Sequence, residues 1–440
     1  MRTTLHILDL AQGGEGVARG EDGRAVFVPF TAPGDRVTAD VPAGAEVAHA
    51  TLVEVLSPGA ARVAPPCPHF GPGEDALCGG CEWLHLGYPA QLQAKERGLA
   101  ETLRRIGRLA PGSYRAPPIV ASPAPLRYRS RAKFHLDRGT GRLVFFRRRS
   151  HEPVQVRECH LLEAELDDLR DAMPAALAAA RLQPREVTLE WSRHDRRGAA
   201  HLTMPSLGAV SRDRAEALLA ALQPLAGVVL SAEGAAPVLA GAPVLRHERH
   251  PGDPAAGLQR SRPDVFQQAN RGANALLVET ALGLLRPDGE DVLELFCGAG
   301  NFTLPLAARA RSVHAVEVQG PSLELARKDA AEASALRDRI RFFAGDALAL
   351  ARAFARETGP QARRFGAALL DPPREGARGI GPALRDLGVP RAVYVSCDPA
   401  TLARDLAACV EAGFRVEAVQ AVDMFPQTHH VEGVALLSRR

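Results

Sequence analysis

Short apolar stretches alternate with helical stretches through the second half of the chain, and this alternation restricts the fold more than any other feature. The expected strands from about residue 259 onward are 292–296, 312–318, 341–344, 367–370 and 392–396, and the expected helices are 302–309, 323–335 and one from 399. An antiparallel pair at 414–422 and 433–437 closes the series. Such alternation predicts an α/β fold with a doubly wound, mostly parallel sheet, whose ligands bind at the carboxyl ends of its strands.

A glycine-rich turn, Cys-Gly-Ala-Gly-Asn at 297–301, follows the first of these strands. Gly298 and Gly300 allow a ligand to approach the backbone where a side chain would clash. Glu317 ends the next strand, where ribose-hydroxyl acceptors are placed. Dinucleotide enzymes have a third glycine here, but this chain has Thr303. The sequence therefore favours S-adenosylmethionine (SAM), which has a ribose but no pyrophosphate, over NAD.

Three more carboxyl-end positions carry polar residues. They are Gly345-Asp346, Asp371-Pro372-Pro373-Arg374 and Ser396-Cys397-Asp398. A single aspartate at such a position can be only a helix cap. A series of them after successive strands indicates a binding site.

Cys397 and Glu432 are the candidates for chemistry. Cys397 comes between a buried strand and a helix, where the helix N-terminus favours a thiolate. A thiolate and a carboxylate beside a methyl donor predict methylation at a pyrimidine carbon, because thiolate addition at C6 activates C5 and a base must then remove the C5 proton. Two alternatives are that Cys397 is a core residue and that His429 or His430 acts as the base or binds a metal.

Residues 1–57 contain short strand-prone runs separated by turns, which suggests a small barrel of the OB type. Such a barrel offers a nucleic-acid-binding face or simply caps the protein. The turn with Gly14 and Gly16 and the Phe27-Val28-Pro29 run resemble the TRAM domain, a small RNA-binding barrel found on RNA-modifying enzymes.

A basic stripe follows in the middle of the chain, although the net charge is only +3. Its members include Arg127, Arg129, Arg131, Lys133 and Arg147-Arg148-Arg149. Such a stripe is typical of proteins that bind phosphate backbones, and the alternative is an ordinary solvated face.

Four of the seven cysteines form a separate group: Cys67, Cys78, Cys81 and Cys159. Four thiolates suit either zinc or an iron–sulfur cluster, and His69 or His160 is an alternative ligand. Cys297 and Cys409 are expected to be packing residues. The odd and sparse cysteine count argues against a disulfide framework and for reduced thiols.

Together these motifs resemble the RNA (uracil-5-)-methyltransferases, nearly from end to end. The residues that carry the likeness are Phe266-Gln267-Gln268-Ala269-Asn270, LELFCGAGNFTLPLA from Leu293, Glu317, Asp371-Pro372-Pro373-Arg374, YVSCDPATLARD from Tyr394 and DMFPQTHHVE from Asp423. The resemblance implies a Rossmann-like class I methyltransferase domain with Cys397 as nucleophile and Glu432 as proton-abstracting base. It also implies a SAM and uracil site lined by Gln268, Phe296, Asn301, Glu317, Asp346 and Asp371.

The rRNA-modifying subfamily further implies that the four grouped cysteines hold a [4Fe-4S] cluster, with zinc as the alternative. Two departures stand out. Ten residues separate Cys67 from Cys78, which makes Cys67 the least secure ligand, and Gln427 stands where the family often has histidine. The extra length falls in a Pro-Gly-Glu-Asp insert at 72–75. The cysteine spacing of radical enzymes is absent, so a radical mechanism is not expected.

We therefore expect a TRAM-like barrel at 1–57, an α+β central domain with the iron–sulfur site at 58–258 and a methyltransferase domain at 259–440. A helix at 89–109 is expected to pack on the catalytic domain by the same likeness. The expected partner is RNA, rRNA rather than tRNA. With no membrane-length apolar run and no signal peptide, we expect a cytoplasmic protein. We also expect a monomer. The rival functions are an amino-directed methyltransferase and a non-catalytic RNA-binding module.

Overall fold

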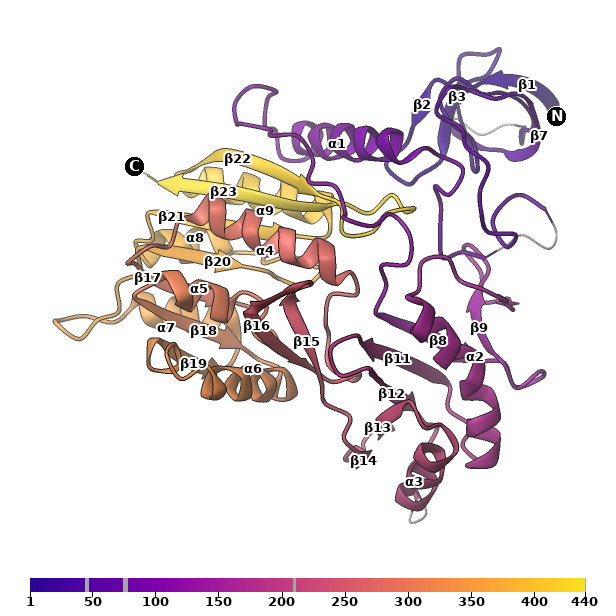
Figure 1. Cartoon of the computed structure of the whole chain (residues 1–440). Helices are drawn as coiled ribbons and strands as arrows, with labels where there is room; N and C mark the ends of the chain where they lie inside the picture. The colour runs from indigo at the N-terminus through magenta and orange to yellow at the C-terminus, as the bar shows by residue number, and fades with distance from the viewer. Residues whose placement is uncertain (44–46, 74–77, 209–210, 440) are drawn as a thin grey trace.

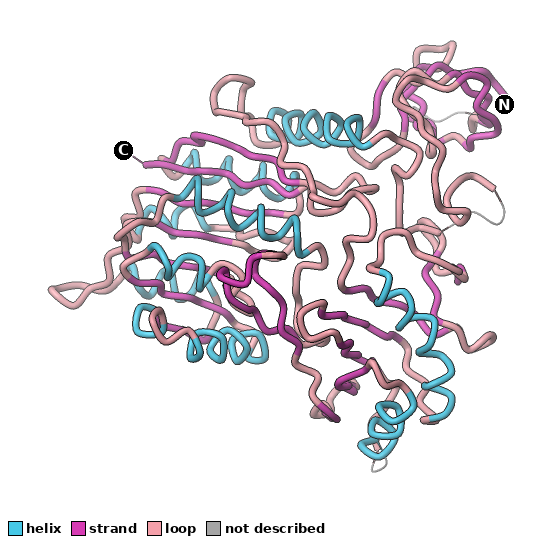
Figure 2. The backbone as a smooth tube through the Cα atoms, viewed as in Figure 1, coloured by secondary structure: helices cyan, strands magenta, loops and turns pink. Residues whose placement is uncertain are grey.

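A computed structural model describes residues 1–43, 47–73, 78–208 and 211–439. Three groups of strands follow one another along the chain, with a long helix bridging the first and the last (Figure 1). The tube view shows that long loops connect these groups (Figure 2). Within the described part of the chain, no helix combines the length and the apolar character that crossing a membrane requires.

The C-terminal sheet carries the alternating pattern. Its described strands run in the order β19-β18-β17-β20-β21-β23-β22. Their bounds are β17 (Asp291–Leu295), β18 (Ser312–Glu317), β19 (Ile340–Ala344), β20 (Ala367–Leu370), β21 (Arg391–Ser396), β22 (Phe414–Val422) and β23 (Glu432–Arg439). The first five strands are mutually parallel, and β23 lies antiparallel between β21 and β22. The predicted doubly wound α/β fold is confirmed.

Helices cover both faces of this sheet. One apolar core joins it to α4 (Arg271–Leu285), α5 (Thr303–Arg309) and α6 (Gly320–Glu332). A second core joins it to α7 (Ala347–Ala355), α8 (Ile380–Asp386) and α9 (Pro399–Glu411). Helix α6 begins three residues before the expected 323 because Pro321 suits the first turn of a helix. A short 3₁₀ turn, Arg337–Arg339, leads into β19.

The central region is built on a second sheet, whose described strands run in the order β10-β9-β8-β11-β12-β13-β14. Their bounds are β8 (Arg131–Leu136), β9 (Leu143–Phe146), β10 (Pro153–Val154), β11 (Glu186–Ser192), β12 (Arg197–Thr203), β13 (Leu225–Ser231) and β14 (Val238–Gly241). Helices α2 (Ala164–Ala179) and α3 (Ser211–Ala221) share its core. The hairpin of β15 (Leu245–His250) and β16 (Asp253–Ser261) contacts both this sheet and α6, so the boundary expected at 258 falls inside β16.

The N-terminal region has two small sheets around one apolar core. The first contains β1 (Arg2–His6), β5 (Arg36–Asp40) and β7 (Thr51–Ser57), and the second contains β2 (Asp9–Leu10), β3 (Gly16–Arg19), β4 (Ala25–Val28) and β6 (Val47–His49). A Cβ atom on Gly16 would lie 2.0 Å from the Thr31 hydroxyl, so this position requires glycine.

Helix α1 (Tyr88–Arg105) lies away from its sequence neighbours and packs against α9 and β22 of the C-terminal region (Figure 1). Leu99 and Leu103 on one stripe of α1 belong to the same core as α9. Gly107 follows the helix, where a Cβ would lie 3.2 Å from the Ala403 carbonyl oxygen. The N-terminal third of the chain is thereby attached to the C-terminal sheet.

Candidate functional site

The glycine-rich loop turns sharply at the carboxyl end of β17. Phe296, Gly298 and Gly300 all have left-handed backbone conformations, with φ of 62°, 55° and 81°. A Cβ built on Gly298 would meet no atom within 4 Å, whereas one on Gly300 would lie 3.2 Å from Ala326 of α6. The loop therefore packs closely on a helix at Gly300 and presents bare backbone to open space at Gly298.

Glu317 is hydrogen-bonded to this loop. One carboxylate oxygen accepts the Gly298 N–H at 2.9 Å, and the other accepts the Gln319 N–H at 2.7 Å. The side chain is buried at the end of β18, as predicted. Its part in binding a ribose remains a prediction.

The remaining predicted cofactor residues have different surroundings. The Asn301 amide exchanges two hydrogen bonds with Asn274 of α4, at 2.8 and 2.9 Å, and so turns toward that helix. Asp346 is exposed and caps α7 by accepting the Ala349 N–H at 2.8 Å. Gln268 is half-buried, two residues before Asn270, which caps α4. The helix-cap explanation thus accounts for Asp346 without a ligand, and its role in a site remains a prediction.

Cys397 and Glu432 come together across two paired strands. Ser396 at the end of β21 pairs with Gly433 near the start of β23, so the next residue on one strand faces the previous residue on the other. Asp371 and Arg374, which follow β20, are close enough to influence both groups. The four residues stand at the carboxyl edge of the sheet, on the same side as the glycine-rich loop.

Burial controls whether Cys397 and the nearby carboxyl groups are charged. It raises the pKa of the Cys397 thiol to about 11, and the Glu432 carboxyl adds to the rise, while the Arg374 guanidinium opposes it. The expected stabilisation of the thiolate by the α9 N-terminus is therefore not the dominant effect, because a thiolate here would be poorly hydrated and close to carboxylates. The resting form is the thiol.

Glu432 is 2% exposed, and its Oε2 has no hydrogen-bond partner. Burial raises its pKa well above the usual range, Asp371 adds to the rise and Arg374 opposes it. Burial also raises the pKa of Asp371 to about 7. A buried carboxylate of this kind is a strong base once it is ionised.

Glu294 is a polar residue of this region that we did not predict as a site residue. Its Oε2 accepts the Thr303 hydroxyl at 2.7 Å, its Oε1 has no partner, and burial raises its pKa to about 8. The sequence carries a signal for it, since Glu294 is the charged residue in the otherwise apolar strand Val-Leu-Glu-Leu. Glu294 is 0% exposed, so this oxygen lies inside the protein and we assign it no direct contact with a ligand.

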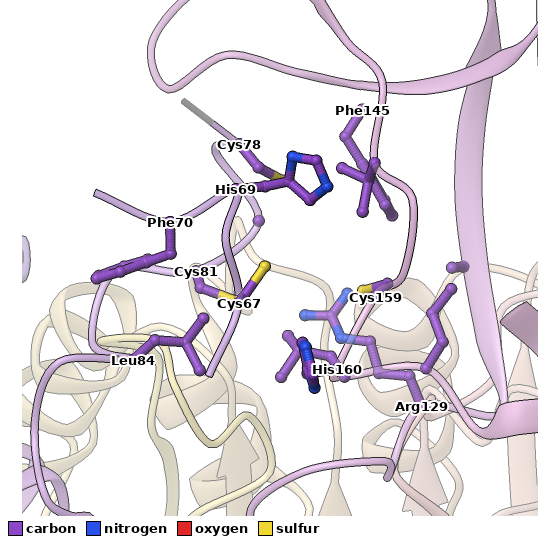
Figure 3. Close-up of a pocket in the computed structure, with 15 residues that line it drawn as sticks. Cys67, His69, Phe70, Cys78, Cys81, Leu84, Arg129, Phe145, Cys159 and His160 are labelled. Atoms are coloured by element: carbon purple, nitrogen blue, oxygen red, sulfur yellow. The ribbon is translucent and has the colours of Figure 1, made fainter. Parts of the chain in front are cut away.

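The four grouped cysteines line one cavity between the central sheet and the segment before α1 (Figure 3). They are Cys67, Cys78, Cys81 and Cys159, and none of them is in a disulfide. Burial raises the pKa of all four thiols, and that of Cys78 reaches about 11. Part of the insert between Cys67 and Cys78, residues 74–77, lies outside the described residues.

Two histidines also line this cavity, His69 and His160. The His69 Nε2 already accepts the Arg157 N–H at 3.1 Å. In the part of the chain that the structure describes, no three potential ligand side chains stand close enough to hold a single metal ion.

The basic stripe is only partly covered: Arg129 and Arg131 are half-buried, whereas Lys133, Arg147 and Arg149 keep exposed side chains, and its role in binding RNA remains a prediction. Arg129 is half-buried and lines the cysteine cavity, 5.9 Å from the Phe425 ring centroid. Arg131 pairs with Glu190 at 3.5 Å, and Lys133 pairs with Glu186. Both acidic partners lie on β11, far from the stripe in sequence, so the sequence around the stripe does not show them.

Arg147, Arg148 and Arg149 are the part of the stripe that lines a groove. The groove measures about 550 Å³ and also contains Gly13, Glu82, Phe146 and His429. It joins the N-terminal region, the cysteine segment and the loop before Glu432. Arg147 pairs with Glu152 and Arg149 with Glu15, but both arginines remain largely exposed.

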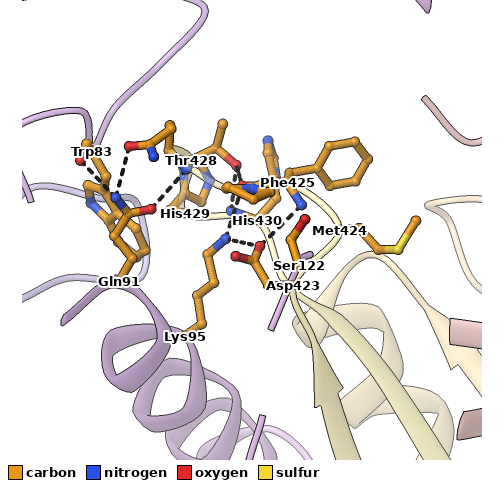
Figure 4. A network of polar contacts seen from close by, with 12 residues as sticks. Trp83, Gln91, Lys95, Ser122, Asp423, Met424, Phe425, Thr428, His429 and His430 are labelled. Atoms are coloured by element: carbon orange, nitrogen blue, oxygen red, sulfur yellow. Dashed lines mark hydrogen bonds and ion pairs between the residues drawn. The ribbon is translucent and has the colours of Figure 1, made fainter. Parts of the chain in front are cut away.

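The loop between β22 and β23 carries Glu432 at its end and is held from α1 (Figure 4). Lys95 is fully buried, donates to Asp423 at 2.5 Å and donates to the Phe425 carbonyl at 3.0 Å. Tyr88 donates to the other Asp423 oxygen at 2.9 Å. Both α1 side chains thus fix the start of the loop.

Sequence and structure comparisons extend these observations. A model of the family described as tRNA (Uracil-5-)-methyltransferase matches residues 256–440, and a TRAM domain model matches residues 2–46. The protein named 23S rRNA (uracil(1939)-C(5))-methyltransferase RlmD from Alkalilimnicola ehrlichii is 35% identical, over 99% of this chain and 96% of its own. Its counterpart from Dechloromonas aromatica is 35% identical, over 96% of each chain.

Among solved structures, the Pyrococcus abyssi tRNA (uracil-54, C5)-methyltransferase in complex with S-adenosyl-L-homocysteine has the same overall fold. The match covers 99% of this chain and 100% of that chain, with a TM-score of 0.73 and 22% sequence identity.

The pKa of Cys397 predicts how its reactivity depends on pH. Because burial raises this pKa to about 11, the thiolate fraction grows about tenfold for each pH unit below it. Alkylation of Cys397 by iodoacetamide, followed by peptide mass spectrometry, should therefore accelerate steadily from pH 7 to pH 10. A rate that levels off below pH 8 would show that the α9 N-terminus lowers the pKa instead.

Proposed function

The chain belongs to the family of RNA (uracil-C5-)-methyltransferases, and from this we propose that it transfers the SAM methyl group to C5 of a uridine in 23S rRNA. The observation that carries the proposal is the placement of Cys397 opposite Glu432 at the ends of β21 and β23. Assignment to rRNA rather than tRNA follows the names of the relatives that match nearly the whole chain. We propose that the protein acts as a monomer.

The chain's own residues divide the reaction between them. The Cys397 thiol gives its proton to solvent and the thiolate adds to C6 of uracil, with Arg374 beside the developing thiolate. SAM, when bound, supplies an electrophilic methyl group to C5. Glu432, in its ionised form, then removes the C5 proton, the C5–C6 double bond re-forms and the Cys397 thiolate leaves. Because Glu432 is buried and its pKa is raised, it holds this proton firmly.

The site fits SAM on two observations. The backbone at Gly298 is bare, since an added Cβ would meet no atom within 4 Å, and Glu317 is hydrogen-bonded beside it, so an adenosine can approach the loop at this point. We propose that Gly298, Gly300, Glu317 and Asp371 hold SAM. The contributions of Gln268, Phe296, Asn301 and Asp346 stand as further parts of this proposal.

We also propose that the four grouped cysteines hold a [4Fe-4S] cluster, which would tie the central region to the segment before α1. The four thiols line one cavity. Four thiolates are the ligand set of a [4Fe-4S] cluster, and they also suit zinc, which is the alternative. We propose a division into the barrel 1–57, the cluster-bearing region 58–258 and the methyltransferase domain 259–440, with strand β16 (Asp253–Ser261) crossing the last boundary.

Two substitutions test the mechanism. Cys397→Ala should abolish formation of 5-methyluridine, and Glu432→Gln should accumulate a covalent RNA–protein adduct, because the adduct cannot lose its C5 proton. Both are measured with 23S rRNA transcripts, by nucleoside mass spectrometry and by denaturing gel. Cys409→Ala, a fully buried position of α9, is the matched control and should keep its activity. Full activity of Cys397→Ala, or a methyl group found on nitrogen, would contradict the proposal.

Metal analysis tests the cysteine site. Protein purified without oxygen should contain about four iron atoms and as many sulfides per chain. Cys81→Ser should lose both, whereas Cys297→Ser, which lies outside the cavity, should keep them. Zinc in place of iron in the wild-type protein would contradict the cluster and support the alternative metal.

Binding measurements test the groove of Arg147, Arg148 and Arg149. The Arg147–Glu152 pair is exposed and contributes little, so Arg147 can exchange Glu152 for a phosphate. The Arg149 side chain is exposed although its partner Glu15 is buried, so it can reach a phosphate as well. The double Ala variant should weaken RNA binding and lower the salt dependence by about one to two ion equivalents. Arg212→Ala, an exposed paired arginine on the distant helix α3, is the control (Figure 1). An unchanged salt slope in the double variant would remove the groove from the RNA interface.

A further inference from the structure

Gln91 of α1 joins the cysteine-bearing segment to the loop that ends at Glu432 (Figure 4). Its Nε2 donates to the Trp83 carbonyl at 3.2 Å, the Leu86 carbonyl at 2.9 Å and the Gln427 Oε1 at 2.9 Å. Its Oε1 accepts the Gln427 N–H at 2.9 Å. The side chain is fully buried, so if one of these hydrogen bonds broke, its donor and acceptor atoms would have no water to replace the lost partner.

The cysteine-bearing segment holds the same loop through its backbone. The N–H groups of Glu82 and Trp83 both donate to the Gln427 carbonyl at 3.0 Å, and these residues directly follow Cys81. Gln427 has a φ of 69°, a left-handed conformation that costs a non-glycine residue free energy. This conformation persists because contacts from Gln91 and the cysteine segment enclose the residue on several sides.

We call the contacts of Gln427 with Gln91, Glu82 and Trp83 the joint between α1, the cysteine-bearing segment and the loop. The two reacting side chains differ in how they depend on this joint. Glu432 follows the loop directly, five residues after Gln427. Cys397 stands between β21 and α9, next to Asp398, which caps that helix by accepting the Thr401 N–H at 2.8 Å. Glu432 is the first residue of β23 and pairs with Val422, so the sheet holds it on one side only and a movement of Gln427 reaches it through the loop on its other side. Cys397 is joined instead to β21 and α9.

We infer that Gln91 is a positioning residue for Glu432, and that the four-cysteine site acts on the reaction through the same joint. The inference rests on the proposed function. When the joint is disturbed, removal of the C5 proton slows, so the electrons of the C5–H bond do not re-form the double bond and the Cys397–C6 bond does not break. Addition of Cys397 to C6 and methyl transfer continue, and methylated RNA remains bound covalently to the protein.

The test is Gln91→Met, which keeps the size of the side chain and removes its hydrogen bonds. At saturating RNA and SAM, turnover should fall roughly tenfold to a hundredfold while the covalent adduct accumulates. Amide hydrogen exchange should accelerate in residues 425–431 and stay unchanged in the cysteine-free segment 391–396. Wild-type protein stripped of its metal should show the same two changes.

Two further variants keep the outcome decisive. Gln427→Gly tolerates the left-handed backbone without strain and lacks the Gln91 contact of its side chain, so it should also accumulate adduct. Thr102→Val removes a buried hydroxyl from the same helix, which donates to the Gly98 carbonyl at 2.7 Å, and should not accumulate adduct.

These experiments distinguish failure of the proposed function from failure of the inference about Gln91. A wild-type protein that makes no 5-methyluridine would refute the proposed function. A wild-type protein that methylates normally, with Gln91→Met and Gln427→Gly releasing their product as fast, would overturn only this inference. Adduct in the Gln91 variant but none after metal removal would overturn the link to the cysteine site.

Discussion

The buried ion pair between Lys95 and Asp423 is the contact on which the arrangement of the site depends. Both side chains are fully buried, so each charge has lost its water and is stabilised by the other. Burial lowers the pKa of Lys95, and Asp423 opposes that change. Breaking one partner of such a pair leaves an uncompensated charge, a costly state. Lys95 comes from α1 and Asp423 begins the loop to Glu432, so the pair fixes the distance between two regions that the sequence places far apart.

The reversed direction of β23 explains why the nucleophile and the base meet. In a fully parallel sheet the first residue of a strand lies at the edge opposite to the ligand site. Because β23 runs antiparallel to β21, its first residue, Glu432, lies instead where β21 ends. One inverted strand therefore brings a carboxylate from the start of a strand to the edge where Cys397 and the glycine-rich loop already lie.

Local pattern was enough to predict part of this site and not the rest. The glycine-rich turn, Glu317 and Cys397 follow apolar strands directly, and their place at one edge of the sheet follows from the alternation alone. The neutralisation of Lys133 by Glu186 depends on strand pairing between β8 and β11, which the sequence does not display. The raised pKa of Cys397 depends on how deeply the thiol is buried. Its position before a helix had instead predicted a lowered pKa.

The attachment of α1 has a consequence for the order in which the protein folds. Gln91 and Gln427 are 336 residues apart, and Lys95 and Asp423 are 328 apart. Contacts across such separations form late, since the intervening chain must first be ordered. During synthesis on the ribosome, α1 therefore presents an apolar stripe and an unpaired lysine until nearly all of the described chain has emerged. We expect this helix to be the segment of the nascent protein that chaperones shield.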